Sequence, residues 1–261
     1  MYLGIDIGST TSKAIILNGK GDVVGREIIN TGTGTDGPNL AVKSVLKQAG
    51  ISQGAIHKCV VTGYGRLLFE NADKQITEIS CHAKGISYLI PEARTIIDIG
   101  GQDAKVISLN GEGKVDNFVM NEKCAAGTGR FLEVMARLLD CNLKELSELA
   151  DKGKEGVAIS SICTVFAESE MISQLAAGNT RADVALGAHR AIAKRICGMA
   201  NRVDVKPSVV MTGGAALDTN LVKLISQELG TVITMPKDPQ AVGALGAAIF
   251  AKEIDEKRKK E

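Results

Sequence analysis

Two cysteines stand in segments whose residues could bind a metal. Cys124 lies in NEKCAAGTGRFLE, and Cys163 lies 39 residues later in SSICTVFAESE. Each stands just ahead of a predicted helix start, and neither has the CxxC spacing typical of a zinc or redox site. A helix N-terminus favours a thiolate, and its free N–H groups can donate hydrogen bonds to the sulfides of an iron–sulfur cluster. The two thiols are therefore candidate cluster ligands.

A [4Fe–4S] cluster needs four thiolates, and one chain offers two good candidates. A two-fold homodimer would bring four thiols to its axis, and such dimers are the commonest oligomers. We therefore expect one cluster shared by two copies of the chain. The remaining cysteines lie in apolar strand or helix patterns and are expected to be small buried hydrophobes, namely Cys59, Cys81, Cys141 and Cys197.

The chain that must position these cysteines contains an internal repeat. The segments IDIGSTTSKAIILNGKGDV (residues 5–23) and IDIGGQDAKVISLNGEGKV (97–115) are identical at 11 of 19 positions, at a constant offset of 92. Each predicts a strand, a polar turn, a second strand, an Asn-Gly-x-Gly hairpin turn and a third strand. The same structural unit therefore occurs twice.

A second pair of similar segments locates an insertion. VVTGYG (60–65) resembles VVMTGGAA (209–216), and both predict a buried strand that ends in Thr-Gly. Asp6 precedes Gly63 by 57 residues, whereas Asp98 precedes Gly213 by 115. The second copy is thus 58 residues longer, and both cysteine segments fall in the longer stretch.

Helical patterns alternate with these strands, so we expect an α/β fold of two similar halves that share a cleft. The first half is expected to span residues 1–93, with a C-terminal helix at 240–261 packing at or across it. The second is expected to span 94–239 and to include the cysteine-bearing insertion at about 117–180. Helices are predicted at 39–50, 129–140, 143–153, 167–178, 182–203, 221–230 and 241–254.

The repeated turns DIGSTTSK (6–13) and DIGGQDAK (98–105) favour phosphate binding, because glycine lets backbone N–H groups approach an anion. Two such turns could hold one polyphosphate, and Asp6 and Asp98 could anchor hydrated Mg²⁺. Phosphate contacts are expected from Gly8, Ser9, Thr10, Thr11, Ser12, Lys13, Gly100 and Gly101. Lys105 is either a phosphate ligand or only a lysine at the hairpin edge.

Gln102 and Asp103 mark where the second turn departs from the first. A glutamine here could orient an attacking water, and a carboxylate could act as a base. The sequence does not choose between these two catalytic candidates.

Other function classes find little support. The Walker pattern GxxxxGK[ST] is absent, and the GxGxxG match GTGTDG (32–37) follows the third strand of a meander and lacks an acid about 20 residues on. We expect a loop or helix lead-in there, and no dinucleotide site. A net charge of +1 and 3% aromatic residues argue against nucleic acid. No apolar run approaches the ~18 residues of a membrane span, so a cytoplasmic protein with reduced cysteines is expected.

The two DxG turns and VVMTGGAALDTN resemble the acetate and sugar kinase, heat-shock chaperone and actin superfamily. The resemblance implies a duplicated actin-like (ribonuclease H-like) ATPase fold whose DxG turns bind the phosphates and Mg²⁺ of ATP or ADP. It also implies that residues 211–217 pack on the adenosine, and that Gly243 and Gly246 lie where the halves meet. The further nucleotide contacts it implies are Gly213, Gly214, Ala215, Pro236 and Gln240.

The two cysteine segments resemble one branch of that superfamily, the activator ATPases of (R)-2-hydroxyacyl-CoA dehydratases, with the BadF/BcrA-type ATPase subunits of benzoyl-CoA reductase as close relatives. The resemblance implies a homodimer with one bridging [4Fe–4S] cluster held by Cys124 and Cys163. It also implies ATP-driven delivery of a low-potential electron to a partner dehydratase or reductase, with ferredoxin or flavodoxin as the donor.

Two alternatives stay open. A small-molecule kinase of the same superfamily would phosphorylate a substrate without iron, although no sugar-binding insertion is evident. A non-redox ATP-binding switch would function after both cysteines were replaced by serine. The identity of an acceptor enzyme cannot be read from the sequence.

Overall fold

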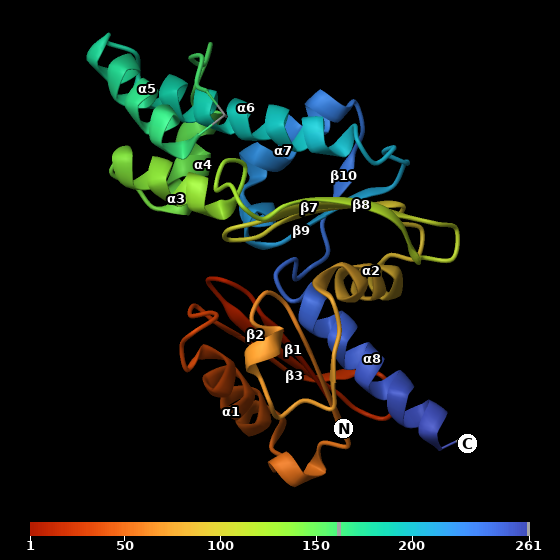
Figure 1. The fold of residues 1–261 in the computed structure, drawn as a ribbon. Helices are drawn as coiled ribbons and strands as arrows, with labels where there is room; N and C mark the ends of the chain where they lie inside the picture. The colour runs from red at the N-terminus through yellow and green to blue at the C-terminus, as the bar shows by residue number, and fades with distance from the viewer. Residues whose placement is uncertain (161–162, 260–261) are drawn as a thin grey trace. The chain divides into compact units, whose positions relative to one another are not determined.

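The computed structural model describes residues 1–160 and 163–259. The chain forms two compact units. Unit 1 comprises Met1–Ala93, Leu109–Asp116 and Pro236–Glu261, and unit 2 comprises Arg94–Ser108 and Asn117–Met235. Each unit is built on one five-stranded mixed sheet (Figure 1).

Unit 1 carries the sheet with strand order β3-β2-β1-β4-β5. Its strands are β1 Tyr2–Ile7, β2 Ser12–Leu17, β3 Val23–Ile29, β4 Lys58–Thr62 and β5 Lys74–Gln75. Its helices are α1 Gly37–Ala49, α2 Glu78–Leu89 and α8 Val242–Arg258, with short 3₁₀ turns η1 Gln53–Ala55 and η2 Arg66–Leu68.

Unit 2 carries the sheet with strand order β10-β9-β6-β7-β8. Its strands are β6 Thr95–Ile99, β7 Ala104–Leu109, β8 Val115–Asn121, β9 Val209–Thr212 and β10 Ile233–Thr234. Its helices are α3 Gly129–Leu138, α4 Leu143–Asp151, α5 Thr164–Ala176, α6 Arg181–Ala200 and α7 Thr219–Leu229, with a 3₁₀ turn η3 Gly214–Leu217.

The two sheets confirm the duplication. β1 pairs antiparallel with β2 and parallel with β4, so that Asp6 lies opposite Lys13 and Thr62. β6 pairs in the same way with β7 and β9, and here Asp98 takes the place of Asp6. Both sheets therefore present an aspartate at the same register, next to the turn that follows the first strand.

The hairpin turns repeat in atomic detail. The side-chain oxygen of Asn18 accepts hydrogen bonds from the backbone N–H groups of Lys20 and Asp22. That of Asn110 accepts from Glu112 and Lys114. An asparagine that satisfies its own turn in this way fixes a tight connection, as the Asn-Gly pattern predicts.

The core of unit 1 depends on a close approach of α8 to the first sheet. α8 packs against β1, β4 and α2. A Cβ at Gly4 would collide with the backbone of Ala244 and Ala248, and one at Gly246 would collide with the Cys81 carbonyl. Glycine at position 4 therefore allows the last helix to lie directly on the first strand, and glycine at position 246 allows α8 to approach α2 closely.

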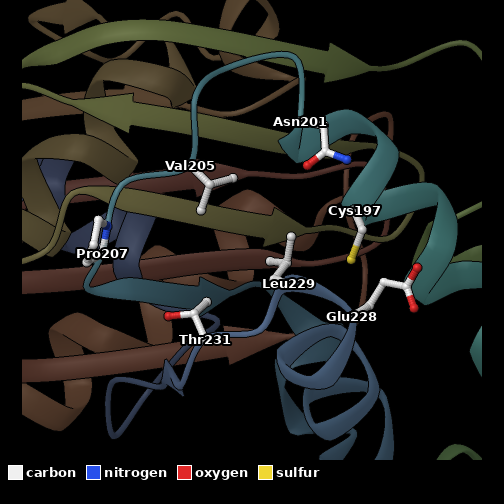
Figure 2. Close-up of a pocket in the computed structure, with 7 residues that line it drawn as sticks. All are labelled: Cys197, Asn201, Val205, Pro207, Glu228, Leu229 and Thr231. Carbon is white, nitrogen blue, oxygen red and sulfur yellow. The ribbon is translucent and has the colours of Figure 1, made fainter.

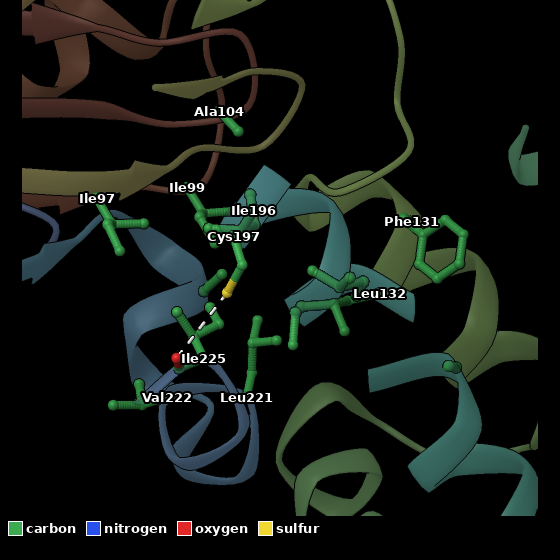
Figure 3. Close-up of a cluster of buried hydrophobic side chains, with 14 of the residues drawn as sticks. Ile97, Ile99, Ala104, Phe131, Leu132, Ile196, Cys197, Leu221, Val222 and Ile225 are labelled. Carbon is green, nitrogen blue, oxygen red and sulfur yellow. Dashed lines mark hydrogen bonds between the residues drawn. The ribbon is translucent and has the colours of Figure 1, made fainter. Parts of the chain in front are cut away.

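The core of unit 2 lies between its sheet and a layer of helices. Figure 3 shows Ile97 and Ile99 of β6 near Ile196 of α6 and Ile225 of α7. Phe131 of α3 is fully buried in the same cluster. Burial of each large side chain contributes about 1.5–3 kcal/mol to stability, so this cluster can hold the helices on the sheet.

The structure adds one helix and moves the ends of others. α2 is absent from the sequence predictions. α5 begins at Thr164, at the helix start expected just after Cys163, and so extends the apolar helical pattern at 167–178 toward the N-terminus. Cys141 lies in the turn after α3 and is half-buried, whereas an apolar strand or helix position was expected. The extent of the cysteine-bearing insertion stays a prediction.

Candidate functional site

The turn between β1 and β2 holds the first set of predicted residues. Asp6 is 5% exposed, and the Lys13 ammonium lies 3.2 Å from its Oδ2. The Gly8 N–H donates to the Thr11 carbonyl at 2.9 Å and closes the turn. A Cβ at Gly8 would lie 3.1 Å from Lys13 Nζ. The turn thus brings a carboxylate and an ammonium together beside a glycine.

Of the four hydroxyl residues in this turn, one is already engaged. Ser12 is fully buried, and its hydroxyl donates to the Thr31 carbonyl at 2.8 Å. Ser9, Thr10 and Thr11 are half-buried and are better placed for a ligand. The predicted donors therefore lie together, but Ser12 serves the turn itself.

The turn between β6 and β7 repeats this arrangement with more charge. Asp98 is 3% exposed, and its Oδ2 lies 2.9 Å from Lys105 Nζ. Lys105 is buried and also pairs with Asp103 Oδ2 at 2.7 Å. The Gly100 N–H donates to the Asp103 carbonyl at 2.9 Å, as Gly8 does to Thr11. Lys105 is therefore buried between two carboxylates, and its role as a phosphate ligand stays a prediction.

The second turn differs from the first at its outer surface. Gln102 is exposed, and Asp103 is half-buried by its contact with Lys105. On the inner side, the Thr212 hydroxyl donates to Asp98 Oδ1 at 2.7 Å. The Asp98 carboxylate is thus held from two sides, by an ammonium and by a hydroxyl.

A glycine follows each neighbouring parallel strand at the same place. Gly63 has φ +90° and Gly213 has φ +86°, a region that side chains rarely adopt. A Cβ at Gly63 would collide with Asp6 and the Ile7 carbonyl, and one at Gly213 with the Ile99 carbonyl. The Thr-Gly segments found in the sequence therefore let the backbone approach both aspartate strands closely.

The predicted adenosine residues divide between the two units. Gly213, Gly214 and Ala215 form the η3 turn of unit 2, and Ala215 is buried. Pro236 and Gln240 belong to unit 1, where Pro236 is buried and Gln240 is half-buried. Their contacts with a nucleotide stay predictions.

The glycine-rich segment 32–37 proves to support the first turn. The Thr33 N–H and hydroxyl both donate to the Gly8 carbonyl, at 2.9 and 3.0 Å. A Cβ at Gly32 would collide with Gly8 and Ser9. Since α1 begins at Gly37, the expectation of a helix lead-in is confirmed. Its role as a support for Gly8 could not be inferred from the motif.

Sequence reasoning also missed His82, which lies beside Asp6. The side chain is 6% exposed on α2. A Cβ on Gly243 of α8 would lie 2.9 Å from Asp6 Oδ2 and 3.1 Å from His82 Nε2. The sequence signal that could have predicted α2, the helix that carries His82, was its N-cap residue Thr77, which accepts a hydrogen bond from the Ser80 N–H.

The loop that carries Cys124 is bonded directly to the second turn. The Asn121 amide donates to the Cys124 carbonyl at 2.9 Å, which orders the loop. At its end the Gly129 N–H donates to the Gly100 carbonyl at 2.8 Å. The next N–H, of Arg130, donates to the Gly101 carbonyl at 2.7 Å. These hydrogen bonds therefore couple the position of the second turn to the start of α3.

Cys163 is the N-cap residue of α5 and has an extended backbone. Among the described residues, no side chain accepts a capping hydrogen bond from the first N–H groups of this helix. Ser161 and Ile162, which belong to the predicted segment, lie outside the described residues. α5 packs against α3, so the helices that follow the two cysteine segments are neighbours.

The six thiols fall into distinct environments. Burial raises the pKa of Cys59, Cys81 and Cys197 to about 12, which keeps them protonated at neutral pH. Burial also raises the pKa of Cys141. Cys124 and Cys163 are half-buried. Within residues 1–160 and 163–259, no three His, Cys, Asp or Glu side chains of the chain form a group that could hold a metal ion.

Two surface pockets lie near these elements. A pocket of about 280 Å³ adjoins the first turn in unit 1. Its lining includes Ile7, Thr33, Thr35, Gly65, Leu68 and Phe69. Figure 2 shows one of about 250 Å³ in unit 2, which contains the inert thiol of Cys197 and none of the predicted site residues. No helix in the described part of the chain has the length and apolar character needed to cross a membrane.

Comparison with known proteins identifies the family. Residues 3–251 match the BadF/BadG/BcrA/BcrD ATPase family. The chain belongs to this family.

Individual family members are similar over their whole length. The activator of lactoyl-CoA dehydratase from Anaerotignum propionicum is 51% identical over 259 residues, which cover 99% of this chain and all of that protein. The (R)-2-hydroxyglutaryl-CoA dehydratase activating ATPase from Acidaminococcus fermentans is 48% identical over 250 residues, 95% of this chain and 96% of the relative.

A solved structure agrees closely. The activator of the 2-hydroxyisocaproyl-CoA dehydratase from Clostridium difficile, with bound ADPNP, is 48% identical and superposes with a TM-score of 0.95. The match covers all of this chain and 97% of that one. With the two matching sheets, it confirms the predicted α/β, duplicated actin-like ATPase fold.

Proposed function

We propose that this member of the ATPase family is an ATP-hydrolysing iron–sulfur activator. It would deliver a low-potential electron to a partner (R)-2-hydroxyacyl-CoA dehydratase or a related double-cluster enzyme. The observation that carries the proposal is the direct bonding of the Cys124-bearing loop to a repeated Asp-Ile-Gly turn, through Gly129 and Arg130. A nucleotide-binding element and a candidate metal ligand are thereby joined by a few covalent and hydrogen bonds.

ATP would be bound through the phosphate turns. Each turn combines a buried aspartate, a lysine within 3.2 Å of it and a glycine without a side chain. Backbone N–H groups and lysines suit phosphate oxygens, and carboxylates suit hydrated Mg²⁺. Asp6 and Asp98 would hold the metal through water, and Lys13 and Lys105 would neutralise phosphate charge. The ADPNP bound to the Clostridium difficile activator supports this assignment.

Hydrolysis needs a group that orients the attacking water. Gln102 is exposed on the second turn, where its amide can offer both a donor and an acceptor. Asp103 Oδ2 lies 2.7 Å from Lys105 Nζ, and this ion pair limits the movement of the carboxylate. We therefore assign the orienting role to Gln102 and a structural one to Asp103.

A [4Fe–4S] cluster would be held by Cys124 and Cys163 of two protomers. The donor set fits, because both thiols are half-buried and iron–sulfur clusters take thiolates. When bound, the cluster would supply one-electron transfer at low potential. The uncapped N–H groups at the start of α5 would donate hydrogen bonds to it and stabilise negative charge there.

A homodimer is supported by the exposed face of α5. Val165, Phe166 and Ile172 follow Cys163 on this helix and are 66, 63 and 55% exposed. The hydroxyls of Ser169 and Ser173 donate to carbonyls one turn earlier in the helix. Because these serine hydroxyls are already hydrogen-bonded within the helix, the face can be buried against a second copy without leaving them unsatisfied.

The remaining partners follow from the same role. A reduced ferredoxin or flavodoxin would supply the electron, and a dehydratase or reductase component would accept it. The relatives named as activators of lactoyl-CoA and (R)-2-hydroxyglutaryl-CoA dehydratases support an acceptor of this class.

Anaerobic iron and sulfide analysis with electron paramagnetic resonance tests the proposal. About four irons per dimer are expected, with a spectrum that changes when MgATP is added. Cys124→Ser or Cys163→Ser should abolish the cluster, and Cys141→Ser is the matched control. Four irons per chain, or none after anaerobic reconstitution, would overturn the proposal. Phosphorylation of a small molecule by iron-free protein would favour a kinase instead.

A further inference from the structure

A buried polar network lies directly behind the turn that is expected to contact adenosine. Asp218 follows that turn and accepts from the Ser147 hydroxyl at 2.7 Å and from the Leu221 N–H at 3.0 Å. Its other oxygen lies 2.8 Å from His189 Nε2. His189 is 0% exposed, Ser147 is 7% and Asp218 is 8%. The network therefore joins α4, α6 and the start of α7 out of contact with water.

Both ring nitrogens of His189 have partners. His189 Nδ1 lies 2.8 Å from the Ala185 carbonyl oxygen, and Nε2 lies 2.8 Å from Asp218 Oδ2. Burial alone would raise the pKa of Asp218, but the bonds from His189, Leu221 and Ser147 outweigh it and lower the pKa. A hydrogen-bonded His–Asp pair is thus held in the interior.

Such a pair is a poor source of stability, because its polar groups lose their hydration when they are buried. The neighbouring contacts are already apolar: Figure 3 shows Leu221 and Ile225 of α7 near Ile196 of α6. α6 and α7 would therefore pack without the pair. The contribution of the pair is to hold the Asp218 carboxylate in one orientation.

Two hydrogen bonds from Asn220 also hold the same segment against α4. The Asn220 amide donates to Asp151 Oδ1 at 2.8 Å, and the Asn220 N–H donates to the Ser147 hydroxyl at 3.3 Å. Ser147 and Asp151 are one turn apart on α4. The residues just after the turn are thus held at two points along one helix.

We propose that His189 is a positioning residue for nucleotide binding, which with Ser147 holds Asp218 and so the turn at residues 213–217 in the shape that receives adenosine. This inference rests on the proposed function, because that function assigns the turn to the nucleotide. His189 touches no nucleotide itself and acts through Asp218. Its contribution should therefore concern the adenosine part of ATP and leave the phosphate turns unaffected.

Comparison of two ligands isolates this contribution. Dissociation constants for MgATP and for magnesium tripolyphosphate, which lacks the nucleoside, are measured on the full chain by calorimetry. His189→Gln removes the imidazole that contacts both Ala185 and Asp218. We expect it to weaken MgATP binding about tenfold and tripolyphosphate binding less than twofold. Ser147→Ala, which leaves the contact of His189 with Asp218 intact, should weaken MgATP binding about threefold.

Two further variants separate positioning from general destabilisation. Thr180→Ala removes the N-cap of α6 without touching the network and should leave the ratio of the two constants unchanged. Asp218→Asn combined with His189→Gln restores a neutral, hydrogen-bonded pair and should recover part of the MgATP affinity. If His189→Gln does not fold, the two dissociation constants of Ser147→Ala test the proposal by themselves.

Each remaining outcome has a defined meaning. Equal weakening of both ligands, or no change in either, would overturn the positioning role while the proposed function stands. Wild-type protein that binds no MgATP would overturn both. Normal nucleotide results together with absence of iron would overturn the proposed function's redox part and leave this inference intact.

Discussion

Gly243, in the first turn of α8, leaves room for the Asp6 carboxylate. A Cβ at this position would lie 2.9 Å from Asp6 Oδ2, closer than such atoms normally come. The carboxylate or the helix would have to move. Misplacement of a catalytic group by about 1 Å can cost about 100-fold in rate.

We therefore predict that Gly243→Ala lowers the rate of phosphate release from MgATP by about 10- to 100-fold. Gly198→Ala on α6 is the matched control, because no atom lies within 4 Å of its added Cβ. That change should leave the rate unaltered and stabilise the helix by up to about 1 kcal/mol. A wild-type rate in Gly243→Ala would contradict the role given to Asp6.

At the residue scale the sequence predicted the two repeated turns but not the contacts that each of their side chains makes. The spacing of Asp6 and Lys13 follows from a local hairpin, so their proximity could be predicted. The engagement of Ser12 with Thr31 and the position of His82 beside Asp6 depend on packing between distant segments. No local pattern encodes such contacts.

At the element scale, α7 depends on Asp218 as its N-cap. The pKa of this carboxyl is lower in the folded chain than its ordinary value of 3.8. A lowered pKa means stability that is present above the unfolded value and is lost as pH falls through the folded one.

Asp218→Asn should accordingly reduce the free energy of unfolding by about 1–3 kcal/mol at pH 7. The difference from wild type should stay constant down to about pH 5 and shrink below about pH 4. Urea unfolding followed by circular dichroism at a series of pH values measures it. Glu148→Gln, at an exposed site on α4, should change the free energy by less than about 0.5 kcal/mol. A difference that persists unchanged to pH 3 would refute the assignment.

Element prediction failed where tertiary packing overrides local preference. α2 contains Gly85 and several polar residues, which lower its intrinsic helix propensity, and its packing against α8 stabilises it. The start of α5 just after Cys163 agrees with the prediction. Helices with regular apolar spacing, such as α4 and α7, were predicted well.

At the scale of the whole molecule, the proposed dimer depends on α5. Phe166→Glu would place a charge in the apolar face that follows Cys163. We expect the variant to sediment as a monomer at micromolar concentrations where wild type is a dimer, and to bind little iron. MgATP binding should be unchanged, because the phosphate turns are untouched.

Leu67→Glu serves as the control for this change. Leu67 is 69% exposed in unit 1 and so tests whether a new surface charge is harmful in itself. Its sedimentation and iron content should match those of wild type. An intact, iron-loaded dimer in Phe166→Glu would exclude this face of α5 as the interface.

The duplication made the overall architecture predictable, because 11 identities at one offset imply two equal sheets. The repeat could not predict which elements from outside the repeated segments pack against its strands. The contact of α8 with β1 joins regions that have no similarity to one another. It depends on Gly4, whose importance appears only when two backbones meet.

That contact also affects the order in which the protein can fold during synthesis. The Tyr2 hydroxyl donates to Asp255 across 253 residues, and β1 is translated long before the helix that covers it. At ~5–20 residues per second, the ribosome takes on the order of ten seconds or more to reach α8. Until then the apolar side chains of Tyr2, Ile15 and Val60 lack their cover. Unit 2 can complete its core while unit 1 still exposes apolar surface to chaperones and to other nascent chains.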